Sequence, residues 1–177
     1  MISAVVLLLT LTACGTKDST ELAVYDRFAA EDGVLPTSDK LGECDEIKTL
    51  YHHGSYFPFA SDSYILKAAY SAEAFDEALQ NVKSEYTFQK STMTDKAEEN
   101  TLSPTFSLDG YDFGVLALNI YCQENSEYPE EIYFIGVNQV KRTIAYVHFY
   151  DPDLDVAESL PYILTEYCGW DRIKWPI

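Results

Sequence analysis

Residues 131–137 and 143–150, EIYFIGV and TIAYVHFY, decide the fold. Both stretches are rich in branched and aromatic side chains, which favour strands. The polar stretch between them contains Asn138, Lys141 and Arg142. Two strand-like runs joined by a short polar connection are typical of an antiparallel hairpin, so the sequence predicts one here.

Two further strands are predicted outward from this hairpin. Residues 112–121, DFGVLALNIY, are apolar on both faces, which favours a central position covered on each side. Residues 63–70, SYILKAAY, are aromatic and branched enough for a fourth strand.

Helices are predicted on either side of the three later strands. Ser71 is placed to cap a helix whose apolar residues recur at helical spacing: Phe75, Ala78, Leu79, Val82 and Tyr86. A last helix is expected after Ser159, with Pro161 in its first turn and Gly169 at its end. Strands grouped in a run with helices at the ends predict an α+β fold, an antiparallel sheet of about four strands covered by two or more helices.

The remaining segments complete the expected domain organisation. Residues 14–42 are predicted to be a tether with a short helix at 20–32, and residues 43–177 a single α+β domain. Within that domain, a second short helix is expected from Cys44 to His53 and an exposed loop from Gln89 to Ser103.

The composition limits the partners of the chain. Its 177 residues include 12 Lys plus Arg and 29 Asp plus Glu, a formal net charge of -17. With 47% hydrophobic residues the chain is too apolar for disorder and has the length of one soluble domain. An acidic surface repels phosphate backbones and anionic headgroups, which excludes nucleic acids and electrostatic docking to acidic lipids.

The first fourteen residues, MISAVVLLLTLTAC, form an uncharged apolar run that ends at a cysteine. The run is shorter than the roughly 20 residues that a spanning helix needs and has the length of a signal-peptide core. Leu11-Thr12-Ala13-Cys14 resembles the lipobox of bacterial lipoproteins. The resemblance implies that residues 1–13 are a signal peptide, cleaved before Cys14, and that a diacylglyceryl group is attached to the Cys14 sulfur.

This resemblance implies an outward-facing protein anchored by lipid in the cell membrane, or in the outer membrane of a Gram-negative cell, since Gly15 rather than Asp follows the cysteine. Met1-Ile2-Ser3 lacks the Lys or Arg with which such signals open, so the true start of translation can lie elsewhere. The alternative is that the apolar run is a buried strand or helix of the domain.

The acidic, tyrosine-rich domain behind the lipobox is also similar to small lipoproteins of Gram-positive gut bacteria. That resemblance includes the strand at 144–150 running into Asp151-Pro152-Asp153-Leu154-Asp155. Such families carry no established activity, so the resemblance bears on location alone.

An acidic triplet suggests a calcium loop at first sight. Asp151, Asp153 and Asp155 alternate, and Glu158 follows. An EF-hand loop needs Gly at its sixth position and Glu at its twelfth, where this chain has Val156 and Tyr162. A looser oxygen site remains as an interpretation beside a solvated turn in which Asp155 or Ser159 caps a helix.

No catalytic or cofactor motif is found. His52, His53 and His148 have no close metal-ligand spacing, and adjacent His52 and His53 point to different sides of any regular element. No G-x-S-x-G turn, P-loop or G-x-G-x-x-G is present, so no cofactor, metal or catalytic residue is predicted. Paired carboxylates could hydrolyse glycans, but 29 acids bring some pair to the required separation by chance.

Three cysteines remain after Cys14. Cys122 closes a strand expected to be central and is predicted to be a buried thiol, which leaves Cys44 and Cys168 for a disulfide; three free thiols are the alternative. Fourteen Tyr, with Trp170 and Trp175, suggest either a stacking platform for sugar or peptide or rings that hold a small sheet to its helices.

These observations favour a lipid-anchored extracytoplasmic domain that binds a protein, peptide or glycan of unknown identity. The alternatives are an extracytoplasmic acidic hydrolase acting on glycan or cell-wall material, and an envelope lipoprotein without a ligand. A cleft with two buried carboxylates of perturbed pKa would favour the hydrolase.

Overall fold

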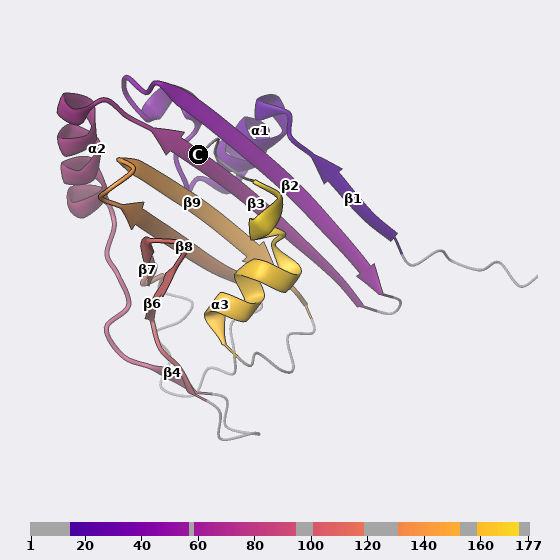
Figure 1. The fold of residues 1–177 in the computed structure, drawn as a ribbon. Coiled ribbons are helices and arrows are strands. Elements are labelled where there is room, and N and C mark those ends of the chain that lie inside the picture. Colours follow the sequence, from indigo (N-terminus) through magenta and orange to yellow (C-terminus); the bar gives the residue numbers. More distant parts are fainter. Residues whose placement is uncertain (1–14, 57–58, 95–100, 119–130, 153–158, 174–177) are drawn as a thin grey trace, which may run out of the picture.

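The computed structural model describes residues 15–56, 59–94, 101–118, 131–152 and 159–173. In these ranges seven strands form one antiparallel sheet in the order β1-β2-β3-β9-β8-β7-β6 (Figure 1). The strands are β1 (Gly15–Ser19), β2 (Glu46–Tyr56), β3 (Phe59–Ala69), β6 (Thr105–Leu108), β7 (Tyr111–Val115), β8 (Glu131–Asn138) and β9 (Thr143–Tyr150). The predicted α+β class is confirmed, but the sheet is larger than the expected four strands.

The predicted hairpin is the pair β8–β9, in register from Glu131 opposite Tyr150 to Asn138 opposite Thr143. β9 lies between β3 and β8, and all its residues but Tyr150 are buried. The central position expected for residues 112–121 is therefore wrong. β7 lies next to the edge strand β6, and Asp112 is exposed between buried Tyr111 and Phe113.

Each face of the sheet carries its own core cluster. On one face, the helices α1 (Leu22–Asp32) and α2 (Ala72–Glu85) cover residues such as Leu66, Ile135 and Ile144; we call this the α1–α2 face. On the other, the α3 face, a C-terminal segment covers Ile65, Phe134 and Val147. That segment comprises α3 (Leu160–Tyr162), the π-helical turn η3 (Ile163–Tyr167) and the 3-10 turn η4 (Trp170–Arg172).

The two clearest helix predictions are confirmed. The Ser71 hydroxyl accepts a hydrogen bond from the Ala74 N–H at 3.3 Å, and Phe75, Ala78 and Val82 of α2 are buried. The last helix begins in the same way, because the Ser159 hydroxyl accepts from the N–H of Tyr162. Gly169 ends it with a φ of 69°, a left-handed conformation that glycine adopts without strain.

The helix predicted from Cys44 to His53 is wrong, because residues 46–56 form β2. Ile47, Leu50 and Tyr51 fit a helical face, but the structure places Ile47 with the α1–α2 cluster and Leu50 with the α3 cluster. β2 pairs with β3 along all eleven of its residues, and this pairing overrides the local spacing.

The segment predicted as a tether is largely folded onto the sheet. β1 pairs with residues 51–55 of β2, Tyr25 and Ala29 of α1 are buried, and a 3-10 turn, η1, follows at Ser38–Lys40. The exposed loop expected from Gln89 to Ser103 is also partly structured. Its short strands β4 (Met93–Thr94) and β5 (Thr101–Leu102) pair, and Met93 and Leu102 join the α3-face cluster.

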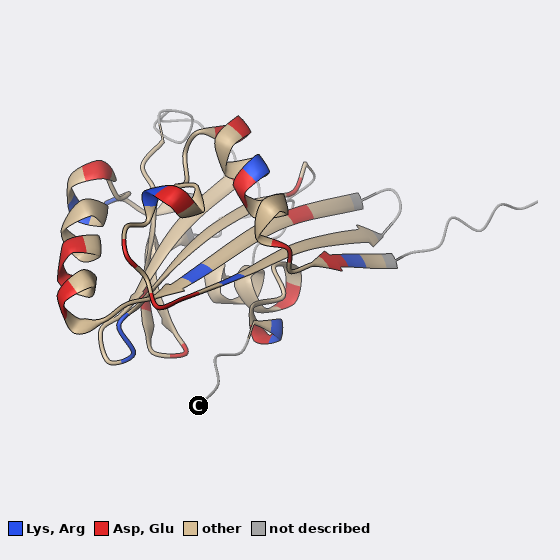
Figure 2. Cartoon of the chain, turned by 90° about the horizontal axis from the view of Figure 1, so that it is seen from above, with Lys and Arg blue, Asp and Glu red and all other residues tan. Residues whose placement is uncertain are grey.

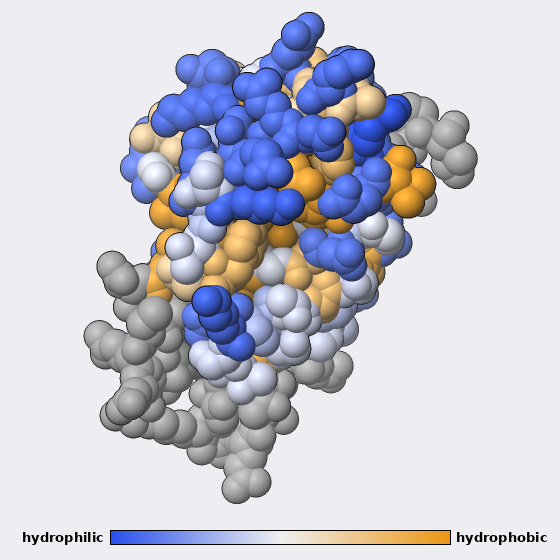
Figure 3. Space-filling view, turned by 90° about the vertical axis from the view of Figure 1, so that its left-hand side faces the viewer, coloured by the Kyte–Doolittle hydropathy of each residue, from blue (hydrophilic) through white to orange (hydrophobic). Residues whose placement is uncertain are grey.

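Acidic residues are frequent on the helices and connections, and they also occur on several strands (Figure 2). On the side of the molecule where α2 lies, hydrophilic residues cover the upper part and hydrophobic residues appear in a band below it (Figure 3). None of the helices within the described ranges is long and apolar enough to cross a membrane.

Candidate functional site

All three histidines pair with carboxylates on neighbouring strands, near one end of the sheet. His52 of β2 lies opposite Asp18 of β1, and His53 lies opposite Asp62 of β3. His148 of β9 pairs with Glu131 of β8, which lies two residues along β8 from Tyr133, the residue directly opposite His148. Each pair joins two adjacent strands, so the histidines and their carboxylates form a band across five strands. We call this band the histidine band.

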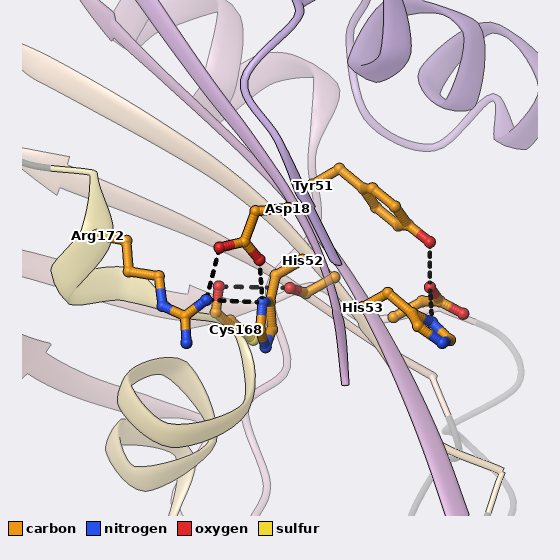
Figure 4. Close-up of polar contacts among 8 residues, drawn as sticks. Asp18, Tyr51, His52, His53, Cys168 and Arg172 are labelled. Atoms are coloured by element: carbon orange, nitrogen blue, oxygen red, sulfur yellow. Dashed lines mark hydrogen bonds and ion pairs between the residues drawn. The ribbon is translucent and has the colours of Figure 1, made fainter. Parts of the chain in front are cut away.

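The first pair lies on the α3 face with an arginine. His52 is 4% exposed, and its Nδ1 is 2.6 Å from Asp18 Oδ1. Arg172 Nη1 donates to Asp18 Oδ2 at 2.6 Å (Figure 4). Burial opposes ionisation of Asp18, but the hydrogen bonds from His52 and Arg172 outweigh it and lower its pKa. Asp18 therefore links the edge strand to the C-terminal segment as an ionised carboxylate.

A carboxylate–imidazole pair is also part of hydrolytic triads, which require a nucleophile beside the imidazole. The residue directly opposite His52 on β3 is Ser63. Ser63 is fully buried, and its hydroxyl donates to the backbone oxygen of Cys168 at 3.4 Å. The neighbouring Cys168 thiol is also fully buried, and burial raises its pKa. Both side chains are removed from solvent, so neither is accessible as a nucleophile for the His52–Asp18 pair.

The second pair lies on the opposite side of β2, as expected for adjacent residues of a strand (Figure 4). His53 Nδ1 is 3.0 Å from Asp62 Oδ1, and the Tyr51 hydroxyl donates to the same oxygen at 2.8 Å. Burial and the bond to Asp62 raise the pKa of Tyr51. His53 and Asp62 are each about one third exposed, so this part of the band is open to solvent.

The third pair belongs to a larger network. His148 Nε2 is 2.7 Å from Glu131 Oε1, and this bond lowers the pKa of Glu131. The Tyr133 hydroxyl lies 2.9 Å from the same Glu131 oxygen and 2.5 Å from Asp32 Oδ1 of α1. One hydroxyl hydrogen serves one acceptor at a time. Tyr133 is thus held between two carboxylates, and burial together with Asp32 raises its pKa.

Aromatic rings surround His148. Phe28 of α1 stacks on Tyr64 with centroids 3.9 Å apart and also lies 4.6 Å from the His148 ring. Tyr133 also contacts the imidazole, with ring centroids 4.7 Å apart, and Tyr51 contacts Tyr64 at 4.8 Å. These rings join α1 to the sheet, which supports the interpretation of the tyrosines as packing residues.

A buried lysine lies apart from the histidine band. Lys67 of β3 is 3% exposed, and its Nζ donates to the backbone oxygen of Ile173 at 3.0 Å. The same Nζ lies 3.3 Å from the centre of the Trp170 ring, whose Nε1 donates to Asp109 at 2.7 Å. Burial lowers the pKa of Lys67 to about 7. The contacts attach the C-terminal turn η4 to the sheet.

The structure contradicts the predicted disulfide and the interpretation of Trp170 as a stacking platform. Cys44 and Cys168 are free thiols in the structure, so the predicted disulfide is not formed. Cys44 packs against the cluster of the α1–α2 face and Cys168 belongs to that of the α3 face, which leaves the sheet between them. Trp170 is 1% exposed and is not a stacking platform.

Several predicted residues lie outside the described ranges: Cys14, Cys122, Asp153, Asp155, Glu158 and Trp175. Asp151 itself is buried. Ser159 caps α3, as expected from the interpretation of the acidic segment as a turn before a helix. In the parts of the chain that the structure describes, no three His, Cys, Asp or Glu side chains are grouped to hold a metal ion.

The pairing of every histidine with an acid was not predicted from the sequence. The available signal was the alternation along residues 46–56, which places His52 and His53 on opposite faces once the segment is assigned as a strand. The acid partners follow only from the register of β1, β3 and β8. The chain matches no protein-family model, no curated protein and no solved structure.

Proposed function

We propose that this chain is a lipid-anchored extracytoplasmic domain, attached through Cys14, that binds a ligand rather than catalysing a reaction. The observation that supports the anchor is the lipobox Leu11-Thr12-Ala13-Cys14, which closes an uncharged apolar run. Gly15 already belongs to strand β1, so a lipid on Cys14 would lie directly beside the sheet.

The burial of His52 and His148 and the lowered pKa values of their carboxylate partners favour binding rather than catalysis. The imidazoles of His52 and His148 are almost fully buried and bonded to carboxylates. The carboxyl groups of Asp18 and Glu131 both have lowered pKa values. A general acid at neutral pH needs the opposite shift, because it must hold a proton.

The anchor is tested by metabolic labelling with a palmitate analogue in cells that express the full chain, Cys14→Ala or Cys44→Ala. We expect label on the wild type and on Cys44→Ala, and loss of label with Cys14→Ala. Cys44→Ala is the matched control because its thiol packs against the folded core. Label that survives Cys14→Ala contradicts the proposal.

One arrangement favours the hydrolase alternative. Asp32 and Glu131 both contact the Tyr133 hydroxyl, and hydrolysis of glycosides uses two carboxyl groups a short distance apart. The lowered pKa of Glu131 makes this the weaker candidate. Release of soluble sugar from cell-wall material by the wild type, abolished in Glu131→Gln and retained in Glu73→Gln on α2, would establish hydrolysis and exclude a purely binding role.

A further inference from the structure

A hollow lies where β1 leaves the sheet. β1 pairs with residues 51–55 of β2, and the chain then turns at Thr20 into α1. Beside residues 47–49 of β2 this leaves a pocket of about 240 Å³, which Arg172 and Ile173 also line. Three segments distant in sequence therefore form its wall, and its volume is somewhat smaller than that of pockets for drug-sized ligands.

The lining of this pocket differs from the rest of the surface. Its apolar wall consists of Leu22, Ile47 and Ile173, and its charged side chains are the cations Lys48 and Arg172. Among the described residues that line it, none is acidic, although the chain has 29 acidic and 12 basic residues. A pocket with apolar walls and two cations is complementary to an anion that carries an apolar body.

Both cations of the pocket already interact with carboxylates of the protein, so a bound ligand must interact with them beside these carboxylates. Arg172 uses Nη1 for Asp18, and a guanidinium has five N–H donors in all. The Lys48 ammonium is 3.4 Å from Glu46, an exposed ion pair of little intrinsic strength. Both side chains are partly exposed, at 28% for Lys48 and 47% for Arg172, so a carboxylate can reach them from the solvent side.

We propose that this pocket binds a carboxylate with an apolar body, its aliphatic part against Leu22, Ile47 and Ile173 and its charge beside Arg172 and Lys48. Two sources offer this chemistry: a short free carboxylic acid and the C-terminal carboxylate of a peptide. The inference rests on the proposed binding role and not on the lipid anchor, because the pocket lies in the folded domain.

The test is calorimetric titration of the full chain with hexanoate, with hexanol as the uncharged counterpart. We expect saturable binding of hexanoate and at least tenfold weaker binding of hexanol, since only the acid can interact with the cations. An N-acetylated peptide that ends in leucine is compared with its C-terminal amide. Tighter binding of the free peptide than of hexanoate identifies a chain terminus as the source, and the reverse identifies a free acid.

Variants separate this site from the rest of the surface. Lys48→Gln is expected to weaken hexanoate binding about tenfold, Lys48→Arg to preserve it, and Leu22→Trp to abolish it by filling the pocket. Lys83→Gln on α2 is the control and should change nothing. Leu22 is 39% exposed, so its replacement spares the core, and thermal unfolding of each variant verifies the fold.

The proposal is overturned if neither acid nor peptide binds saturably, if hexanol binds as well as hexanoate, or if Lys48→Gln and Leu22→Trp leave binding unchanged. These outcomes are independent of the palmitate labelling. A chain that is labelled at Cys14 but binds no carboxylate would support the anchor and contradict the proposed site. A chain that binds a carboxylate but takes no label at Cys14 would contradict the anchor alone.

Discussion

The ammonium group of Lys67 lies 3.3 Å from the centre of the Trp170 indole, inside the core of the α3 face. A cation over an aromatic face is stabilised by the ring quadrupole, most strongly over Trp. Burial nevertheless lowers the pKa of Lys67 to about 7, although Asp109 and Asp171 favour the charged form. Removal from water therefore outweighs these attractions.

Lys67 should make stability depend on pH above neutrality. In the folded chain burial lowers the pKa of Lys67 to about 7, whereas in the unfolded chain Lys67 keeps its ordinary pKa of 10.5. Between these values the unfolded state binds more protons, so stability rises with pH, by up to about 1.4 kcal/mol per pH unit. Urea unfolding from pH 7 to 9 should show this rise in the wild type and its loss in Lys67→Met. If the unfolding free energies of the wild type and Lys67→Met change in parallel with pH, this prediction is contradicted.

Asp18 should contribute stability that also rises with pH, but in the acid range. The folded pKa of Asp18 lies below its ordinary value of 3.8, so the stabilisation is present above that value and is lost as the pH falls through the folded pKa. Because Asp18 is 37% exposed, we expect Asp18→Asn to cost only about 1 kcal/mol at pH 7. The difference in stability between the wild type and Asp18→Asn should narrow below pH 4 in acid titrations followed by circular dichroism.

The control for Asp18 is Asp76→Asn, an exposed position on α2. Its unfolding free energy should stay within about 0.5 kcal/mol of the wild type. Equal losses in the two variants would show that Asp18 has no specific role with His52 and Arg172.

Gly136 should be intolerant of any side chain. A Cβ at this buried position of β8 would lie 2.4 Å from the Phe113 ring, which packs over the glycine from β7. We expect Gly136→Ala to cost about 1–3 kcal/mol through overpacking. A double-mutant cycle with Phe113→Leu measures the clash, since the smaller side chain should recover part of the loss. If the stability losses of Gly136→Ala and Phe113→Leu are additive, the strain does not come from a clash between these two residues.

The proposed anchor also predicts an orientation. Gly15 lies opposite Ser55 in the register of β1 and β2, whereas Val140 is at the turn between β8 and β9, at the other end of the sheet. Ten residues of strand separate these ends by about 30 Å. A lipid on Cys14 should therefore hold Ser55 near the bilayer and keep Val140 in solution.

Fluorophores on Ser55→Cys and Val140→Cys test this in vesicles that carry a quencher on the lipid. Replacement of Cys44 and Cys122 by Ser leaves the fully buried Cys168 protected from the label. We expect stronger quenching at residue 55 than at residue 140. Equal quenching at both sites would show that the domain lies flat or moves freely.

Segments with local signals could be predicted from the amino-acid sequence alone. The hairpin of β8 and β9, the helix α2 with its cap at Ser71 and the turn at Gly169 follow from composition, spacing and capping chemistry within a few residues. The lipobox is also a local motif, and it remains a prediction because residues 1–14 lie outside the described ranges.

The other features depend on contacts between segments that are distant in the sequence. Residues 46–56 have a spacing that suits a helix or a strand, and pairing with β3 selects the strand. The partners of His52, His53 and His148 depend on the register of strands that are remote in sequence. The same holds for the pocket beside Lys48 and Arg172, because residues 20, 48 and 172 meet only in the folded chain. Long-range packing energy, which no local window of sequence contains, brings these groups together.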